Sequence, residues 1–201
     1  DADTGELKWH FQFTPDDPYD YDAVQIPILA DITRNDTEFK VMLWANRNGF
    51  YYVLDRATGR FLSGRPFVTV NWAEGLDDSG RPIETPQPPG EPTYPSLYGG
   101  TNWFSPSYSP RTELFYIPSW EGHATVFEGA PQEYKEGEFF AGSRIRPFEP
   151  VPNAPALQAV TRGPINNWTD VLGHGAVLAL DALTGEQKWK FEMTDVIRSG
   201  I

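Results

Sequence analysis

The stretch Asp1-Ala2-Asp3-Thr4-Gly5-Glu6-Leu7-Lys8-Trp9 occurs again as Asp181-Ala182-Leu183-Thr184-Gly185-Glu186-Gln187-Lys188-Trp189. Both copies read D-A-x-T-G-E-x-K-W. A third, weaker copy is Asp55-Arg56-Ala57-Thr58-Gly59-Arg60, which has Ser63 where the tryptophan would stand. Self-similarity of this kind indicates a repeat architecture, so this stretch decides the fold.

Each copy has the chemistry of a tight turn between two strands. The apolar run 177–180 predicts a buried strand before the turn. Aspartate can cap the turn with its side chain, and glycine can adopt the left-handed conformation. The tryptophan then falls on the returning strand, where it can pack across a sheet edge. The repeat therefore predicts a β-hairpin with an aromatic anchor, and we expect Trp9 and Trp189 to be buried.

The rest of the chain reads as short strands separated by turns. Its 18 glycines and 19 prolines favour many turns over long helices. One set of four strands is predicted at Ile26–Asp31, Lys40–Ala45, Phe50–Asp55 and Arg60–Phe67, led by a single strand at Trp9–Phe13. A second set is predicted at Trp103–Ser109, Leu114–Pro118, Ala176–Asp181 and Gln187–Phe191.

Successive four-stranded antiparallel units are typical of a β-propeller, an all-β fold. We predict that 1–201 is part of a single propeller domain. Residues 1–13 would supply the outer strand of a preceding blade, 24–67 one blade, and 100–193 the next blade with a long insertion at 121–170. Two blades cannot close a ring, so we expect the chain to join the remaining blades of a longer polypeptide or to self-associate.

Composition excludes several classes of function. The net charge of −12 and the lack of a basic stripe argue against nucleic-acid binding. The absence of cysteine removes disulfides and thiol catalysis. No apolar run approaches the length needed to span a bilayer. The acidity would suit a basic protein partner such as an electron carrier, or would simply keep the protein in solution.

Three further segments carry a resemblance to a known family. They are Thr14-Pro15-Asp16-Asp17-Pro18-Tyr19-Asp20-Tyr21-Asp22, then Asn46-Arg47-Asn48-Gly49 with the following 50–56, then Gly99-Gly100-Thr101-Asn102-Trp103 followed by Ser107-Tyr108-Ser109-Pro110. In order and approximate spacing they resemble the catalytic half of the pyrroloquinoline-quinone (PQQ) dependent methanol and ethanol dehydrogenases. The resemblance implies an eight-bladed propeller with PQQ and a metal ion on its axis, located in the bacterial periplasm.

The resemblance also implies roles for individual residues. Asp20 is similar to the family's catalytic base, which lies beside the metal. Arg47 matches the residue that hydrogen-bonds the reactive quinone oxygens, and Asn102 and Trp103 match cofactor-binding positions. These residue types suit alcohol oxidation, in which a carboxylate takes the hydroxyl proton and a guanidinium stabilises developing charge.

Asp22 bears on the identity of the metal. Carboxylates at positions i and i+2 of an extended segment can face the same way, so Asp20 and Asp22 can both bind one ion. Within the family this second aspartate resembles the mark of lanthanide-dependent members, with calcium as the alternative. Asp22 is otherwise one more surface acid.

The function that the resemblance implies is PQQ-dependent oxidation of a small primary alcohol to the aldehyde, with electrons passed to a c-type cytochrome. Two departures from the family pattern are Tyr19, where tryptophan is usual, and Tyr94, where many relatives have cysteine. The family's other metal ligands lie upstream in full enzymes, so we expect the chain to be inactive alone.

A purely structural, non-functional interpretation stays open for each candidate residue. Asp20 could cap a turn, Arg47 could be a solvated side chain at the Asn48-Gly49 hairpin turn, and Asn102 could satisfy loop backbone. For the whole chain, the alternatives are a non-catalytic propeller scaffold or a quinoprotein dehydrogenase of a sugar or polyol.

Overall fold

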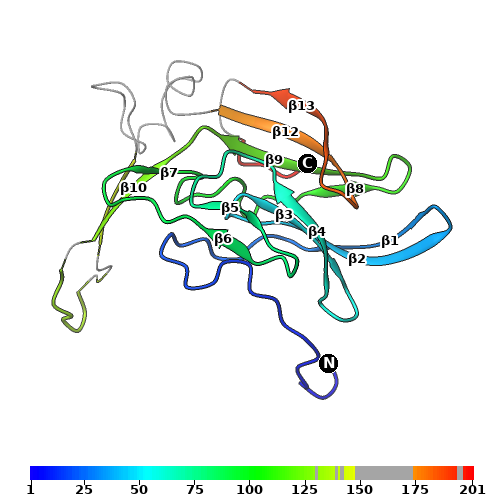
Figure 1. Ribbon diagram of the computed structural model, residues 1–201, viewed down its shortest axis with the longest axis horizontal. Helices are drawn as coiled ribbons and strands as arrows, with labels where there is room; N and C mark the ends of the chain where they lie inside the picture. The colour runs from blue at the N-terminus through cyan, green and yellow to red at the C-terminus, as the bar shows by residue number, and fades with distance from the viewer. Residues whose placement is uncertain (130, 139, 141–142, 148–173, 194–196) are drawn as a thin grey trace.

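The computed structural model describes residues 1–201 except 130, 139, 141–142, 148–173 and 194–196. Two four-stranded antiparallel sheets dominate it (Figure 1). The first has the order β1 (Ile28–Arg34), β2 (Thr37–Ala45), β3 (Phe50–Asp55) and β4 (Phe61–Pro66). The second has the order β13 (Gln187–Glu192), β12 (His174–Asp181), β9 (Leu114–Glu121) and β8 (Ser107–Ser109). The prediction of an all-β chain built from propeller-like four-stranded sheets is confirmed.

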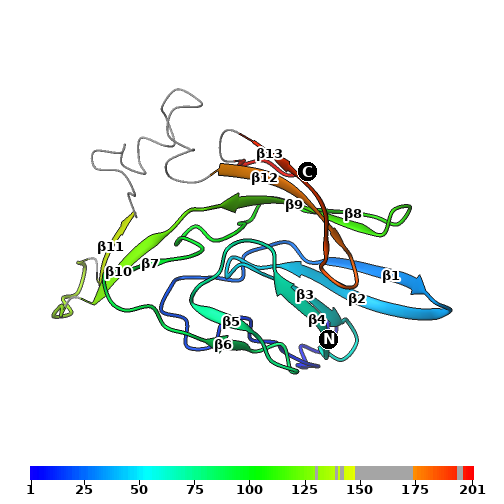
Figure 2. The ribbon, with the colours of Figure 1, turned by 45° about the horizontal axis from the view of Figure 1, so that its top comes forward.

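The two sheets lie one above the other, as Figure 2 shows. Between them is a single apolar cluster to which both contribute: Val41, Leu43, Val53, Phe115, Ile117, Leu178 and Leu180. Strand register keeps these side chains on the shared face, with Leu43 opposite Val53 and Ile117 opposite Leu178. Each fully buried aliphatic or aromatic side chain contributes roughly 1.5–3 kcal/mol.

Two smaller sheets were not predicted from the sequence. β5 (Ala73–Leu76) and β6 (Pro82–Glu84) form a hairpin, and β7 (Pro92–Thr93), β10 (Thr125–Gly129) and β11 (Ser143–Pro147) form a three-stranded sheet. β10 and β11 belong to the insertion predicted at 121–170. Residues 148–170 of that insertion lie outside the described residues.

Two predicted strands differ from the structure. Residues Trp9–Phe13 form no strand. Their aromatic rings pack on the first sheet instead, with Phe13 stacked on Trp44 at 5.1 Å between ring centroids. The strand predicted at Trp103–Ser109 begins only at Ser107, because the backbone from Gly99 to Trp103 forms a loop.

The three repeat copies form the predicted turns. In each turn the aspartate carboxylate accepts hydrogen bonds from backbone N–H groups two and three residues later, and the glycine has positive φ. The acceptors are Asp1, Asp55 and Asp181, at 2.9–3.1 Å. The glycines are Gly5 (φ 72°), Gly59 (φ 73°) and Gly185 (φ 68°).

The two repeat tryptophans have different surroundings. Trp9 is half-buried, donates its indole N–H to the carbonyl of Arg56 at 3.2 Å, and lies over Gly59, where an added Cβ would sit 2.5 Å from its ring. Trp9 thus packs on the turn of the next repeat copy. Trp189 is 43% exposed, so the prediction that it is buried was wrong. Within the described residues no further repeat turn follows β13, and the ring of Trp189 lies 5.7 Å from that of Tyr116 on the same sheet.

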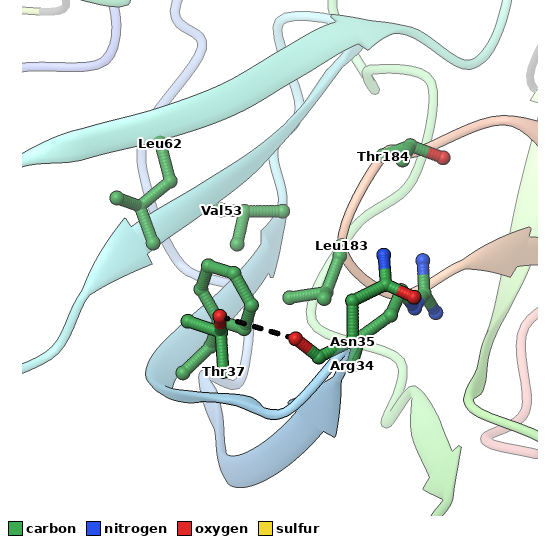
Figure 3. Close-up of a pocket in the computed structure, with 8 residues that line it drawn as sticks. Arg34, Asn35, Thr37, Val53, Leu62, Leu183 and Thr184 are labelled. Atoms are coloured by element: carbon green, nitrogen blue, oxygen red, sulfur yellow. Dashed lines mark hydrogen bonds between the residues drawn. The ribbon is translucent and has the colours of Figure 1, made fainter.

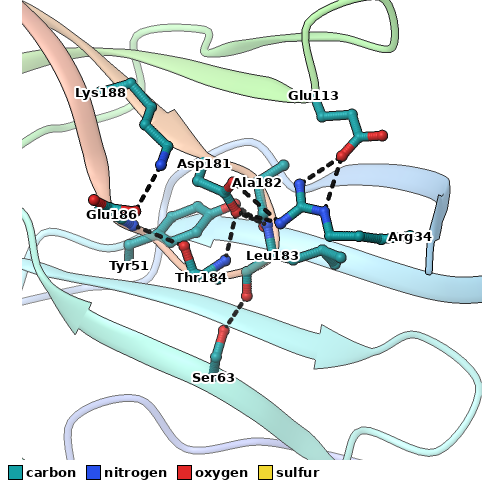
Figure 4. A network of polar contacts seen from close by, with 10 residues as sticks. All are labelled: Arg34, Tyr51, Ser63, Glu113, Asp181, Ala182, Leu183, Thr184, Glu186 and Lys188. Carbon is teal, nitrogen blue, oxygen red and sulfur yellow. Dashed lines mark hydrogen bonds and ion pairs between the residues drawn. The ribbon is translucent and has the colours of Figure 1, made fainter.

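An ion-pair network ties the two large sheets together at one end (Figure 4). Arg34, at the end of β1, donates to Glu113 from Nε at 3.0 Å and to both carboxylate oxygens of Asp181 at 3.0 and 3.1 Å. Burial acts to raise the pKa of Asp181, but hydrogen bonds from Arg34 and Thr184 outweigh it, and the net pKa is lowered. The ionised carboxylate is therefore the form that holds this end of the interface.

Arg34→Met should lower the free energy of unfolding by about 1–3 kcal/mol, because it removes charge-assisted hydrogen bonds to two partly buried carboxylates. Arg111→Met, at an exposed arginine of the β8–β9 turn, should change it by about 0.5 kcal/mol or less. Chemical denaturation of the two variants at pH 7 makes the comparison. Equal stabilities would show that the network contributes nothing to sheet packing.

His123 is the buried histidine of the structure's described part. It is 4% exposed, its ring lies 5.6 Å from that of Trp120, and its Nε2 is buried without a hydrogen-bond partner among the described residues. Burial, helped by the nearby charge of His174, lowers the pKa of His123 to about 4. The folded protein therefore keeps this imidazole neutral where an unfolded chain would protonate it.

The lowered pKa of His123 predicts that its contribution to the free energy of unfolding is complete above pH 6.5 and falls as the pH drops towards 4. In that range the unfolded chain binds a proton on this imidazole that the folded protein does not bind. At pH 4.5 the loss should be about 2–3 kcal/mol. His123→Gln should flatten this part of the pH dependence, whereas His10→Gln, at an exposed histidine, should leave it unchanged. Unfolding midpoints measured between pH 7 and 4.5 decide this, and identical slopes for all three proteins would contradict it.

Among the residues that the structure describes, none forms a helix long and apolar enough to cross a membrane.

Candidate functional site

The turn between β2 and β3 presents Arg47. Two asparagine amides hold this turn: Asn46 accepts from the N–H of Asn48 at 2.9 Å, and Asn48 accepts from the N–H of Phe50 at 3.0 Å. Gly49 has a φ of 94°, which confirms the hairpin turn predicted there. The turn is therefore held by its own side chains on both sides of Arg47.

Arg47 is buried, with 9% of its side chain exposed. It is therefore not the solvated arginine that the non-functional interpretation expected. Its Nη2 donates to the carbonyl of Leu97, and its own carbonyl accepts from the N–H of Gly100 at 2.9 Å. A Cβ added at Gly99 would lie 2.8 Å from Arg47 Cα, so only glycine fits this close approach. The loop from Leu97 to Gly100 thus packs directly against Arg47 and fixes it.

Asp20 and Asp22 both lie within ion-pair distance of this guanidinium. Asp20 Oδ2 is 3.7 Å from Nη2, and Asp22 Oδ2 is 3.6 Å from Nη1. Both carboxylates are open to solvent, with 62% and 63% of the side chains exposed. The structure therefore brings together three residues predicted from the sequence, two as accessible carboxylates and one as a buried cation.

Asp17, which sequence analysis missed, is the turn-capping aspartate of this loop. Its two carboxylate oxygens accept hydrogen bonds from the backbone N–H groups of Tyr19 (2.8 Å) and Tyr21 (2.6 Å). Burial raises the pKa of Asp17, the two N–H bonds oppose that rise, and the charges of Asp20 and Asp22 add to it. The signal in the sequence was an aspartate at the start of a non-helical turn, which is a frequent cap.

The two tyrosines of the loop point inward, into an aromatic cluster around Trp72. Tyr19 is 8% and Tyr21 2% exposed, with rings 5.8 and 5.7 Å from that of Trp72. Tyr21 also donates its hydroxyl to the carbonyl of Pro95 at 2.6 Å, and the Trp72 indole donates to the carbonyl of Asn48 at 3.0 Å. Trp72 was not singled out from the sequence, because nothing local distinguishes it from a core tryptophan.

Asn102 and Trp103 lie further along the loop that packs on Arg47. The Asn102 amide donates to the carbonyl of Tyr98 at 2.9 Å and accepts from the N–H of Trp103 at 2.9 Å. Trp103 is 63% exposed and contacts the ring of Phe104. Asn102 thus bonds loop backbone, as the non-functional interpretation expected. No hydrogen bond, ion pair or ring contact joins Asn102 or Trp103 to Asp20, Asp22 or Arg47 in the described part of the chain.

Comparison with known proteins relates the chain to one protein family. Residues 1–70 match the family model described as "Glucose/ethanol/alcohol dehydrogenase, beta-propeller domain". The chain is 35% identical to "1-butanol dehydrogenase (cytochrome c)" of Thauera butanivorans, over 99% of the chain and 34% of that protein. It is 32% identical to "Lanthanide-dependent methanol dehydrogenase" of Methylacidiphilum fumariolicum, over 98% of the chain and 31% of that protein. The chain is homologous to the PQQ-dependent alcohol dehydrogenases.

Solved structures agree with this assignment. The quinohemoprotein alcohol dehydrogenase ADHIIG of Pseudomonas putida superposes with a TM-score of 0.81 at 31% identity, over 99% of this chain and 29% of that one. A europium-containing methanol dehydrogenase superposes with a TM-score of 0.79 at 30% identity, over 98% and 33%. The chain spans about a third of the length of the quinoprotein relatives it matches.

The residues at this site fit part of the cofactor set that the resemblance implies. Asp20 and Asp22 offer the hard oxygen donors that calcium and lanthanide ions prefer. Arg47 offers planar N–H donors, and its Nε is buried with no acceptor among the described residues. The described part of the chain contains no group of three or more His, Cys, Asp or Glu residues placed to hold a metal. The described residues could therefore supply two carboxylate ligands and one cation, which is less than a complete metal centre.

A cavity of about 340 Å³ lies away from these residues, between the first sheet and the β12–β13 turn (Figure 3). Its walls are Val53, Leu62, Leu183 and other side chains that do not include Asp20, Asp22 or Arg47. It is thus separate from the carboxylate–arginine site.

Proposed function

We propose that the complete protein oxidises a small primary alcohol to the aldehyde with PQQ and passes the electrons to a c-type cytochrome. The observation that carries the proposal is the convergence of Asp20 and Asp22 on the buried guanidinium of Arg47, at 3.7 and 3.6 Å. A structural ion pair alone would not need two carboxylates that are both more than half exposed. In a homologue of PQQ dehydrogenases, such groups are suited to meet a cofactor and a substrate from solvent.

The chemistry divides among the chain's residues. PQQ supplies the quinone that takes up the two electrons of the alcohol. The Asp20 carboxylate is accessible and acts as the base that removes the hydroxyl proton. Arg47 would donate hydrogen bonds to the quinone oxygens, and its burial would strengthen its electrostatic effect there. The loop from Leu97 to Gly100 keeps that guanidinium in place.

Asp20 and Asp22 would hold the metal ion, for which we propose a lanthanide, with calcium as the alternative. Two adjacent carboxylates give the ion's surroundings more negative charge, which a trivalent cation compensates better than a divalent one. When bound, such an ion would supply Lewis-acid chemistry beside these carboxylates. The similarity to a lanthanide-dependent methanol dehydrogenase and to a europium-containing one supports this choice.

The resemblance and the names of the relatives support proposals for the partners, and the resemblance alone supports a proposal for the location. The relative from Thauera butanivorans is named for 1-butanol and cytochrome c. We infer a short primary alcohol as substrate, a periplasmic location, and a basic c-type cytochrome attracted by the net charge of −12. Asn102 and Trp103 are proposed as further cofactor-binding residues on the strength of the family motif.

The proposal is tested by reconstitution of the complete, metal-free protein. Addition of PQQ with lanthanum or calcium should produce reduction of an electron-acceptor dye on addition of ethanol or 1-butanol, and omission of PQQ should remove it. Dye reduction by glucose but not by alcohols would favour a sugar dehydrogenase. No reduction with either class, in a protein that is folded, would favour a non-catalytic propeller scaffold.

A further inference from the structure

We propose that Asp17 is a positioning residue that presents Asp20 and Asp22 to the metal and substrate. The inference rests on the proposed function and deepens it by naming a residue to which the resemblance assigned no role. Its basis is the pair of hydrogen bonds from the N–H groups of Tyr19 and Tyr21 to the two oxygens of one carboxylate. These two N–H groups flank Asp20.

The backbone between them has a conformation that needs such support. Asp20 has a φ of 64°, in the left-handed region that residues other than glycine seldom occupy. The segment lies outside every strand, so no sheet ladder holds its N–H groups. The Asp17 carboxylate takes the place of such a ladder and holds the backbone on both sides of the strained residue.

With the two hydrogen bonds to Asp17 in place, the side chains of the loop point in two directions. Tyr19 and Tyr21 are buried, whereas Asp20 and Asp22 are 62% and 63% exposed. The left-handed residue Asp20 interrupts the extended backbone, so these directions depend on the local hydrogen bonds that fix the loop. Loss of either N–H bond would let the backbone rotate, and the two carboxylates would no longer be held beside Arg47.

The two buried tyrosines also fix the position of the loop relative to Arg47. Both rings lie within 6 Å of the Trp72 ring, at 5.8 and 5.7 Å between centroids. The Trp72 indole N–H bonds the carbonyl of Asn48, the residue after Arg47. A continuous set of contacts therefore runs from Asp17 through the tyrosines and Trp72 to the turn that carries the guanidinium.

The test uses Asp17→Asn in the complete protein, because an amide keeps the shape but offers only one acceptor oxygen for two N–H groups. The matched control is Asp16→Asn, which removes the same charge from an exposed neighbour that also has positive φ (49°). Two readouts are made on each variant. One is binding of terbium to the metal-free protein, followed by luminescence excited through nearby tyrosine and tryptophan, and the other is kcat and KM for ethanol.

Asp17→Asn should weaken terbium binding and lower kcat/KM by about 10–100-fold, the usual effect of removing a residue that orients a ligand. Asp16→Asn should change both by less than about threefold. In an Asp20→Asn/Asp22→Asn background, Asp17→Asn should have no further effect on terbium binding, because the carboxylates through which it acts are gone.

Two results would overturn the role of Asp17: equal effects of Asp17→Asn and Asp16→Asn, or an Asp17 effect that persists in full in the background lacking both carboxylates. Failure of the proposed function looks different. In that case Asp20→Asn/Asp22→Asn would itself leave terbium binding and alcohol oxidation as they are in the unmodified protein.

Discussion

Asp20→Asn is expected to abolish alcohol oxidation by the complete protein, with lanthanum and with calcium alike. An amide cannot accept the hydroxyl proton, and general-base catalysis contributes about 10²–10⁴-fold to a rate. The residue is well placed for this loss to be local, since its side chain is 62% exposed and its contact with Arg47 is a 3.7 Å ion pair. The fold should therefore survive the change, and unfolding midpoints should move little.

The measurement is steady-state dye reduction at saturating ethanol, PQQ and metal. Asp16→Asn serves as the control, because it removes one negative charge from the same loop without touching the site. Retention of more than about a tenth of the activity by Asp20→Asn would assign the base to another group.

Asp22→Ala is expected to reduce lanthanum-supported activity more than calcium-supported activity. Asp20 and Asp22 both lie within 4 Å of the Arg47 guanidinium, and we propose that both bind one ion. The second carboxylate then matters most to a trivalent cation. Lanthanum-supported activity should fall at least about tenfold further than calcium-supported activity, a difference of roughly 1.4 kcal/mol in coupling to the ion.

Assays of the metal-free variant with PQQ and either lanthanum or calcium measure this ratio, with the unmodified protein alongside. The same fractional loss with both metals would make Asp22 a structural acid. An unmodified protein that is fully active with calcium and gains nothing from lanthanum would show that a second aspartate does not select the trivalent ion.

The sequence predicted the parts of the fold whose signals are local. The D-x-x-T-G turns at Asp55 and Asp181 formed as expected, because the aspartate cap and the left-handed glycine are properties of the turn itself. The strand Phe50–Asp55 has the predicted bounds, since an apolar run follows a strong Asn48-Gly49 turn.

The failures lie where tertiary contacts decide the outcome. The Trp9–Phe13 segment has the aromatic content of a strand but finds ring partners in the first sheet in place of a hydrogen-bonded neighbour. Trp189 has the same local sequence as Trp9, yet only Trp9 has a repeat turn to pack on within the described residues. The short strands β5 and β6 carry too weak a periodicity to be predicted.

At the site, the resemblance identified Asp20, Asp22 and Arg47, and the structure brings these three together. It assigned no role to Asp17 or Trp72, whose side chains bond backbone groups 2–24 residues away in the sequence. Asn102 shows the opposite case. The motif assigns it to the cofactor, whereas the structure shows its amide bonded to Tyr98 and Trp103.

The central claim is that Asp20, Asp22 and Arg47 form one wall of a PQQ and metal site. It is tested most directly by an experimental structure of the complete protein with PQQ and lanthanum bound. We predict that the Arg47 guanidinium lies within hydrogen-bonding distance of the quinone oxygens and that both aspartates coordinate the ion. A quinone bound elsewhere, or an ion that neither Asp20 nor Asp22 touches, would contradict the account.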